Sequence, residues 1–382
     1  MSETDPLVAQ WLEPLLADLP GVALVDAHTH IGSNDPDGAR CTAEQLLALL
    51  DPLGASAVVF PMQEPGGYAR ANDAVIAAAA SSERRLVPFC RLDPAGDPVP
   101  EASRCLERGA RGIMLHPRAE AFELDHEQVR EIFAFADANR LPVLIHAGRG
   151  TPALGTHALE LAAEFPHAPI ILAHAAVSDV SWLCERLPEH PNVFIDTAWW
   201  NPLDLVTLFA LAPPGRILFA SDAPYGTPAI NAILTVRCAL QAGLSAEQIT
   251  VVAGRQLERL LAGQGPLDAG PAPGPPSAPR DLILDRTFTY LAMALGRLIV
   301  GAPGEEMVAL ARLGCTVDEA APQAQTCQAI AALIDLNTQL ATNLADLTVP
   351  SPQRLAALGP LLLAATLAAT PRVPVPVAFA AV

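Results

Sequence analysis

Short runs of apolar residues recur through the first two thirds of the chain, and longer segments with a different pattern separate them. Most runs are almost continuous Val, Ile, Leu, Ala and Phe, which is typical of strands buried on both faces of a sheet. The longer segments repeat apolar residues at helical spacing, as HEQVREIFAFADANR at 126–140 does. The pattern predicts strands at 22–27, 55–60, 86–90, 111–116, 142–146, 169–174, 192–197 and 216–221.

Strand and helix alternate eight times over about 200 residues, which predicts an α/β fold built from right-handed βαβ units. Eight such units favour a closed (β/α)8 TIM barrel. The alternative is an open doubly wound sheet, but no glycine-rich fingerprint follows the first strand. Two more helices, at 227–243 and 245–263, complete a barrel domain that we expect to span 1–263. Ser245, with Gln248 three positions later, predicts a capped start for the second of them.

A change of composition follows the barrel. Residues 264–280 are dense in Pro and Gly without periodicity, which indicates a linker or a strap. From 281 onward the chain is rich in Ala and Leu at helical spacing and lacks histidine, so we expect a small all-α module at 281–382. The apolar run at 355–370 is shorter than the ~20 residues that span a bilayer and predicts a buried or partner-facing helix. Three tasks are open to the module: pairing chains as a homo-oligomer, covering the barrel mouth, or contacting another protein.

Charge and composition narrow the class of partner. The formal net charge of −18 argues against nucleic acid or a membrane surface and favours a small-molecule substrate. All 23 basic residues are arginine, which excludes a lysine Schiff base, a phosphate-loop lysine and a carbamylated lysine between two metals. The seven scattered cysteines indicate reduced thiols, and the acidic, polar N-terminus is unlike a secretory signal. These features predict a cytoplasmic location.

Two histidines close the first predicted strand, in VDAHTHIG. Alternate residues of a strand point to the same side, so His28 and His30 reach one metal ion if the strand stays extended through Thr29. Taken alone, a His-x-His pair is more often two ordinary polar residues at a strand end than a metal site.

Other histidines and an aspartate follow later strands in the same way. The C-terminal ends of barrel strands surround one mouth, where active sites lie, so residues far apart in sequence become neighbours there. Core histidines bonded to their neighbours would instead be scattered along the strands, and the four histidines in helices and loops are expected at the surface. The strand-end set is His116, His146, His174 and Asp222, and the surface set is His126, His157, His167 and His190.

Five motifs occur along the barrel in a fixed order: VDAHTHIG, GIMLHP, LPVLIHAG, PIILAHAA and ILFASDAPYG. Together they resemble the amidohydrolase superfamily, specifically its amidohydrolase-related (amidohydrolase-2) branch of TIM-barrel metal-dependent hydrolases and decarboxylases. VVAGRQLERLLAG is similar to the last helix of that branch. The resemblance covers about 22–263 and does not extend to the helical module.

The resemblance implies that His28, His30 and His146 supply imidazole nitrogens to a divalent ion and that Asp222 supplies a carboxylate oxygen. It implies that His174 is either a further ligand or the residue that polarises or protonates the substrate. Three neutral imidazoles and a carboxylate suit zinc, with manganese as the alternative, and leave a position for water whose pKa the ion lowers toward ~7. Asp222 would then accept the proton of that water.

The GIMLHP motif departs from the branch at one position. Members often carry lysine in KLHP, whereas this chain has Met114. Without a lysine or a carboxylate there, a bridged two-metal centre loses its bridge, so we expect one metal per chain. The change leaves His116 as a substrate-pocket residue, with an unusual metal ligand as the alternative.

Side chains near these ligands indicate what the site would bind. Arginines after strand ends are expected to clamp a substrate carboxylate, and we expect one of the three to do so. Aromatic residues after the last two strands would wall a cyclic substrate or pack the loops. Asp26 is expected either to accept a ring N–H from a histidine ligand or to be an ordinary strand-end residue. The arginines are Arg91, Arg118 and Arg149, and the aromatic residues are Trp199, Trp200 and Tyr225.

Three functions follow from this reading. The first is hydrolysis of a C–N or C–O bond in an amide, cyclic amide or lactone by metal-activated water. The second is metal-dependent, non-oxidative decarboxylation of a cyclic or unsaturated carboxylic acid, which the same fold and ligands would serve. The third is a barrel without turnover that acts as an interaction scaffold through its helical module.

Overall fold

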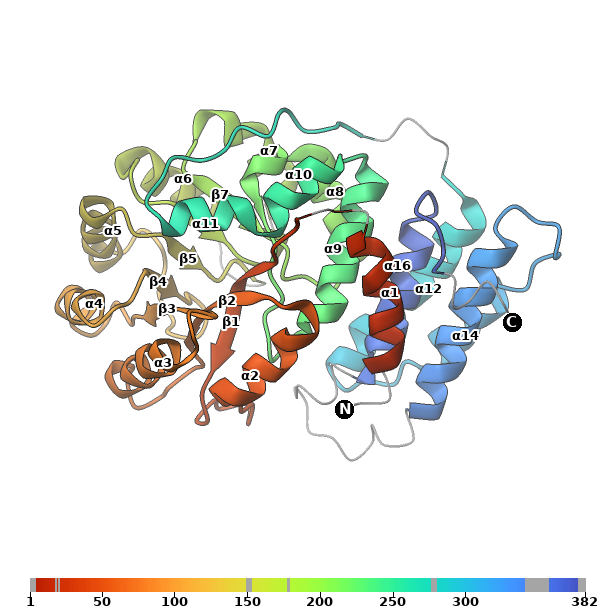
Figure 1. The fold of residues 1–382 in the computed structure, drawn as a ribbon, viewed down its shortest axis with the longest axis horizontal. Helices are drawn as coiled ribbons and strands as arrows, with labels where there is room; N and C mark the ends of the chain where they lie inside the picture. Colours follow the sequence, from red (N-terminus) through yellow and green to blue (C-terminus); the bar gives the residue numbers. More distant parts are fainter. Residues whose placement is uncertain are drawn as a thin grey trace.

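The computed structural model describes residues 5–17, 19, 21–148, 153–176, 179–275, 280–340 and 357–376. Eight parallel strands form one sheet in chain order, and helices cover its outer face (Figure 1). The predicted (β/α)8 barrel is confirmed, and every predicted strand overlaps an observed one. The strands are β1 (Val25–Ile31), β2 (Ser56–Pro61), β3 (Leu86–Arg91), β4 (Gly112–Leu115), β5 (Val143–Ile145), β6 (Ile170–Leu172), β7 (Val193–Asp196) and β8 (Ile217–Leu218).

Hydrogen bonds between the segment around β8 and β1 close the barrel. The amide of Ala27 donates to the carbonyl oxygen of Phe219, and the amide of Asp222 donates to that of His28, both at 2.9 Å. The amide of His30 donates to a carbonyl oxygen just after Asp222, at 2.7 Å. Closure therefore places Asp222 beside two histidines of β1, although 192 positions separate it from His30.

Apolar side chains fill the barrel interior. Phe60, Phe89, Leu144 and Phe194 are fully buried there, because alternate residues of each strand point inward. Met114 of β4 belongs to the same cluster and is also fully buried. The position where the GIMLHP motif was expected to depart from KLHP therefore contributes to the packed interior in this chain.

The helices around the barrel follow the predicted order. A capping box at Ser245 and Gln248 starts the last helical stretch, as expected, and a π-helical turn, Val251–Arg255, interrupts that stretch. N-terminal helix α1 (Asp5–Ala17) packs against α9. The barrel helices are α2 (Ala43–Leu50), α3 (Ala69–Ser81), α4 (Pro98–Glu107), α5 (Glu127–Asn139), α6 (Leu154–Glu164), α7 (Val180–Arg186), α8 (Pro202–Leu211), α9 (Pro228–Ala242), α10 (Ala246–Thr250) and α11 (Gln256–Leu261).

The Pro- and Gly-rich segment is a strap rather than a free linker over residues 264–275. The amide of Leu267 donates to Gln256 Oε1 at 2.9 Å, and Gln248 Nε2 donates to the carbonyl oxygen of Ala269 at 3.0 Å. Side chains of α10 and α11 thus hold the strap against the barrel as it runs toward the C-terminal helices (Figure 1).

The C-terminal region is helical, as predicted, and lies to one side of the barrel (Figure 1). Helix α16 falls within the apolar run at 355–370 and packs against α8 and α9 of the barrel and against α12 and α14 of its own region. Its side chains are buried almost without exception, which explains an all-apolar helix. No helix among the described residues is long and apolar enough to cross a membrane. The helices of this region are α12 (Leu282–Ile299), α13 (Glu305–Gly314), α14 (Ala324–Leu340) and α16 (Gly359–Ala369).

A buried arginine ties the end of the helical region to the barrel. Arg237 of α9 is 1% exposed and donates to Thr370 Oγ1 at 3.1 Å. It also donates to the carbonyl oxygens of Val373 and Pro374 at 3.0 and 2.9 Å. Burial lowers the pKa of Arg237 to about 10, and these oxygen acceptors compensate for the water that the guanidinium loses.

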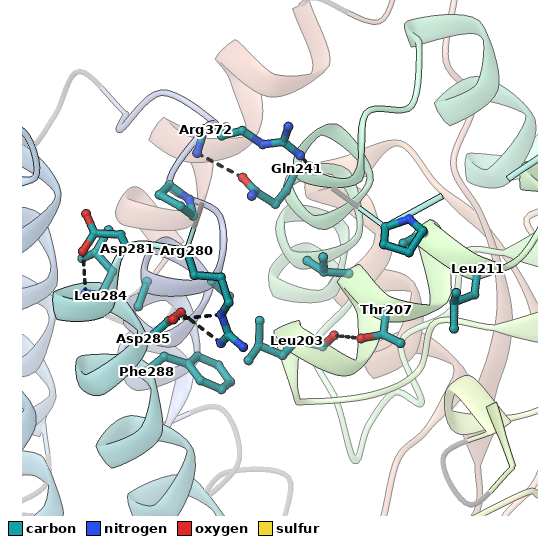
Figure 2. A pocket seen from close by; sticks show the side chains of 16 residues that line it. Leu203, Thr207, Leu211, Gln241, Arg280, Asp281, Leu284, Asp285, Phe288 and Arg372 are labelled. Carbon is teal, nitrogen blue, oxygen red and sulfur yellow. Dashed lines mark hydrogen bonds and ion pairs between the residues drawn. The ribbon is translucent and has the colours of Figure 1, made fainter. Parts of the chain in front are cut away.

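A cavity of about 340 Å³ lies where α8 faces α12 and the segment after α16. Figure 2 shows that its polar groups are already paired: Arg280 bonds to Asp285 at 3.0 Å, and the amide of Arg372 donates to Gln241 Oε1 at 3.0 Å. This cavity contains none of the candidate ligands. It is a seam between the barrel and the helical region, separate from the barrel mouth.

Candidate metal centre

Three side chains from opposite ends of the barrel sequence meet at its mouth. His28 Nε2 and His30 Nε2 are 3.2 Å apart, and Asp222 Oδ1 lies 3.3 Å from the first and 3.0 Å from the second. Ligands bonded at 2.0–2.1 Å to a tetrahedral zinc ion are roughly 3.3 Å from one another. The donor atoms therefore have the identity and spacing that one divalent ion requires, and the extended strand expected through Thr29 is observed.

A second group shares His28. One nitrogen each from His28, His146 and His174 lies within 4.8 Å of the others, and His174 Nε2 is 3.0 Å from His146 Nδ1. His146 is not part of the tighter group with His30 and Asp222. The structure thus brings all five predicted residues to one mouth, but it divides them into two groups joined at His28.

Asp196, at the end of β7, fixes both groups. Its Oδ2 is 2.9 Å from His28 Nδ1, so the ring donates there and leaves the Nε2 lone pair facing Asp222. Its Oδ1 accepts the amide of His174 at 2.9 Å and that of Ala198 at 3.0 Å. Sequence reasoning did not assign Asp196 a role, although its place at the end of the predicted strand 192–197 was a usable signal.

The ring-orienting role expected of Asp26 is wrong. Its Oδ1 accepts the backbone amides of His28 and Ser221, both at 3.0 Å, and no ring nitrogen. Burial raises the pKa of this fully enclosed carboxyl to about 7. Asp26 therefore supports the closure between β8 and β1, because its carboxylate bonds to backbone amides of both segments rather than to an imidazole.

The backbone is strained at two of these positions. His174 and Asp222 have φ values of 58° and 59°, in the left-handed region that residues other than glycine rarely adopt. Such conformations persist where the surrounding structure holds them, and they cluster at functional sites. Here, hydrogen bonds hold them: the amide of His174 donates to Asp196, and its Nδ1 donates to the carbonyl oxygen of Ala198 at 2.7 Å.

Electrostatics favours neutral imidazoles at His30 and His146 and a charged carboxylate at Asp222. Burial lowers the pKa of His30 to about 4 and holds that of His146 well below its ordinary value. Burial acts to raise the pKa of Asp222, but His28 and His30 outweigh it and keep the pKa below its usual range. Burial likewise opposes protonation of His28, yet the carboxylates of Asp222 and Asp196 raise its pKa. A half-buried carboxylate among imidazoles is an environment that a divalent cation would neutralise.

His116 belongs to the cavity wall. Its ring stacks on that of His146, with centroids 3.7 Å apart and planes at 13°, and its Nδ1 accepts the amide of Ala119 at 3.2 Å. Burial, with the charges of Arg91 and Arg118, lowers its pKa to about 2. It is in neither ligand group, which favours the pocket role over the ligand role.

The three arginines after strand ends differ in their surroundings. Arg91 is 2% exposed and donates to Glu120 Oε1 at 2.7 Å, and Tyr68 donates to the same oxygen at 2.6 Å. Its charge is thus already paired with Glu120, a residue that sequence reasoning did not select. Arg118 is exposed at the cavity and has no ion-pair partner among the described residues. Arg149 lies outside the described residues.

Residues of both ligand groups line a cavity of about 660 Å³. Trp199 and Trp200 line it, with ring centroids 5.7 Å apart, and Trp199 is anchored by its Nε1–H to Asp204 Oδ2 at 2.7 Å. Tyr225 also lines it and donates to Asp35 Oδ2 at 2.5 Å. The predicted aromatic wall is therefore present. Three further lining residues come from the helical region: Gly296, Ile299 and Val300.

Residues outside the mouth agree with their predicted roles. His126 and His167 are exposed, and His157 and His190 are half-buried, so none of the four contributes to the ligand groups. All seven cysteines are free and buried, consistent with reduced thiols.

Comparison with known proteins identifies the barrel. A family model described as amidohydrolase matches residues 25–252, which is more than half of the chain. No curated protein matches the sequence. Among solved structures, an uncharacterized TIM-barrel protein from Bordetella bronchiseptica is similar with a TM-score of 0.51 and 15% identity, over 63% of this chain and 99% of its own.

Two of the similar solved structures have named activities. 2,6-Dihydroxybenzoate decarboxylase from Rhizobium matches with a TM-score of 0.51 and 17% identity, over 63% of this chain and 99% of its own. 5-Carboxyvanillate decarboxylase from Sphingomonas paucimobilis matches with a TM-score of 0.50 and 16% identity over the same shares. At these identities the likeness shows the barrel fold alone.

Proposed function

Because the chain belongs to the amidohydrolase family, we propose that it is a metal-dependent hydrolase that cleaves a C–N or C–O bond of an amide, cyclic amide or lactone. One observation carries the proposal: the ligand atoms of His28, His30 and Asp222 lie 3.0–3.3 Å from one another beside a cavity. We assign the site one divalent ion, zinc first and manganese as the alternative, because nitrogen and oxygen ligands discriminate poorly between such metals.

His28, His30 and Asp222 would hold the divalent ion, which when bound would lower the pKa of a water molecule toward neutral. The Asp222 side chain is 22% exposed, so it reaches the cavity and accepts the proton of the attacking water. The Nδ1–H of His174 is fixed by a carbonyl oxygen, which leaves Nε2 free to exchange a proton with His146 or with the leaving group. Asp196 keeps the His28 ring oriented throughout.

Non-oxidative decarboxylation of a cyclic or unsaturated carboxylic acid is the second candidate. Arg118 favours it, because an exposed guanidinium beside the ligand groups suits a substrate carboxylate. His174 would then move the proton to the carbon that loses carbon dioxide. Two structures with this fold are named decarboxylases, but a shared barrel does not decide between the two chemistries.

Turnover by the zinc-loaded chain tests the proposal. Lactones, cyclic amides and aromatic acids are offered in parallel, with acid release and carbon dioxide release followed separately. Acid release from a lactone or cyclic amide supports the hydrolase. Carbon dioxide release without a hydrolytic product would replace it by the decarboxylase. The double variant His28→Ala, His30→Ala is the matched control, and turnover that survives in it would mean that the reaction occurs elsewhere.

Metal content separates both enzymes from a scaffold without turnover. About one zinc or manganese ion per chain is expected, because the tighter group offers one set of converging ligand atoms. A chain that stays metal-free in added zinc would favour the scaffold instead.

A further inference from the structure

The last turn of α12 reaches the barrel mouth, although it lies beyond the part of the chain that matches the family. Gly296, Ile299 and Val300 line the same cavity as His174 and Asp222. Gly296 lies against an aromatic ring: a Cβ atom added there would stand 3.9 Å from the indole of Trp200. The helical region therefore supplies part of the wall around the candidate metal centre.

A smaller cavity continues from this point between the barrel and the helical region. It has a volume of about 190 Å³ and shares His174 and Asp222 with the main cavity. Most of its wall is apolar and comes from three sources: the barrel loops, α12 and the start of α16. The apolar lining residues are Trp199, Trp200, Ile230, Leu295, Ile299, Leu358 and Leu362.

A positively charged side chain, Arg118, lies on the side of the mouth opposite this recess. Arg118 follows β4, whereas the tryptophans and Tyr225 follow β7 and β8. In a closed barrel of eight strands in chain order, β4 stands opposite β8. A molecule that crosses the mouth thus meets a guanidinium on the β4 side and, on the β8 side, an apolar recess next to His174 and Asp222.

We propose that α12 and α16 form a subsite for an apolar side group of the substrate, and that the substrate is a small carboxylate with an alkyl or aryl substituent. This assignment rests on the proposed function, since it places the substrate at the same metal centre. The recess has room for a short alkyl chain or one ring. Such a group carries no polar atom that would be left unpaired when the apolar walls bury it.

A homologous series of ligands tests the subsite by binding rather than by turnover. Benzoate and 4-alkylbenzoates from methyl to butyl are titrated calorimetrically into the zinc-loaded full-length chain. Each methylene that becomes fully buried raises affinity about fourfold, so a gain of two- to fourfold per carbon is expected. Ile299 lines the recess, so Ile299→Trp enlarges its wall and should remove that gain while benzoate still binds. Ile299→Phe adds less volume and should reduce the gain less than tryptophan does.

A control on the same helix keeps the result interpretable. Met293 is 50% exposed and lines neither cavity, so Met293→Leu should keep the full gain per methylene. Thermal unfolding of each variant checks that α12 still docks. An affinity that does not rise along the series in the unaltered chain, or a rise that Ile299→Trp leaves intact, would overturn the subsite.

The two proposals fail in different ways. Zinc binding and hydrolysis with a flat alkylbenzoate series would remove the subsite and keep the hydrolase. Failure to bind zinc would remove both, and that is measured on the same protein before any ligand is added.

Discussion

The barrel mouth and the helical region bury very different side chains. At the mouth, fully buried His28 and Asp196 are bonded to each other at 2.9 Å, and the site depends on individual donor atoms. In the helical region the buried residues are almost all apolar, and its pair Arg312–Asp335 lies at the surface. Polar groups are costly to bury unless they are paired, so a network of them indicates a task other than packing.

This difference shows what each region needs in order to do its part. Ligand atoms at the mouth must stand at bonding distance from one point, which requires the hydrogen bonds of Asp196 and the closure of the barrel. The helical region needs only shape and buried area to dock and to wall the cavity. Changes at the mouth should therefore alter chemistry without loss of stability, and changes at the docking face should do the reverse.

The largest expected effect is on chemistry alone. Asp222→Asn removes the proton acceptor, and at saturating zinc we expect kcat to fall by about 10²–10⁴-fold. Chemical denaturation should show little change in stability, because the amide is isosteric and partly exposed. A fall of less than tenfold would mean that another residue accepts the proton.

The next effect is on stability alone. Arg237→Ala leaves the carbonyl oxygen of Val373 and the hydroxyl oxygen of Thr370 buried without their donor, at about 1–3 kcal/mol each, so we expect a loss of about 3 kcal/mol. Denaturation midpoints measure the loss. Zinc content should stay at the level of the unaltered chain. If zinc binding disappears while the protein remains folded, the two regions are not independent.

A change in the residue that orients His28 should affect metal affinity. Asp196→Asn cannot accept the ring N–H in the same way, and we expect zinc to bind about 10–100-fold more weakly. Competition with a chromophoric chelator measures the affinity. The isosteric Asp26→Asn is the comparison, since Asp26 Oδ1 accepts the backbone amides of His28 and Ser221 and no ring N–H. Equal loss in both variants would show that Asp196 acts through the fold rather than through the ring.

The smallest expected effect concerns the surface of the helical region. Arg312→Ala breaks an ion pair whose partners are both about half exposed, so stability should change by roughly 0.5 kcal/mol or less. The same denaturation measurement as for Arg237→Ala provides the contrast. A loss of similar size in both variants would contradict the distinction between buried and exposed arginines.

Much of the barrel and of its candidate ligands was predictable from local pattern. Buried strands read as apolar runs, and residues at their C-terminal ends share one mouth, so His28, His146 and Asp222 could be selected together. The division of the ligands into two groups could not be predicted, because it depends on distances of a few tenths of an ångström between strands. The choice between the two roles expected of Asp26 was undecided for the same reason: strand alternation gives the side of a residue, but not its hydrogen-bond partner.

The sequence by itself determined the order of strands, the kinds of ligand at their ends and the absence of a bridging lysine, because these depend on periodicity and residue identity. Only the tertiary structure decided that Asp196 holds His28, that Arg91 is neutralised by Glu120 and that the end of α12 walls the cavity. Those contacts join segments far apart in the chain, and barrel closure and helix docking, which no local pattern encodes, determine which of them meet.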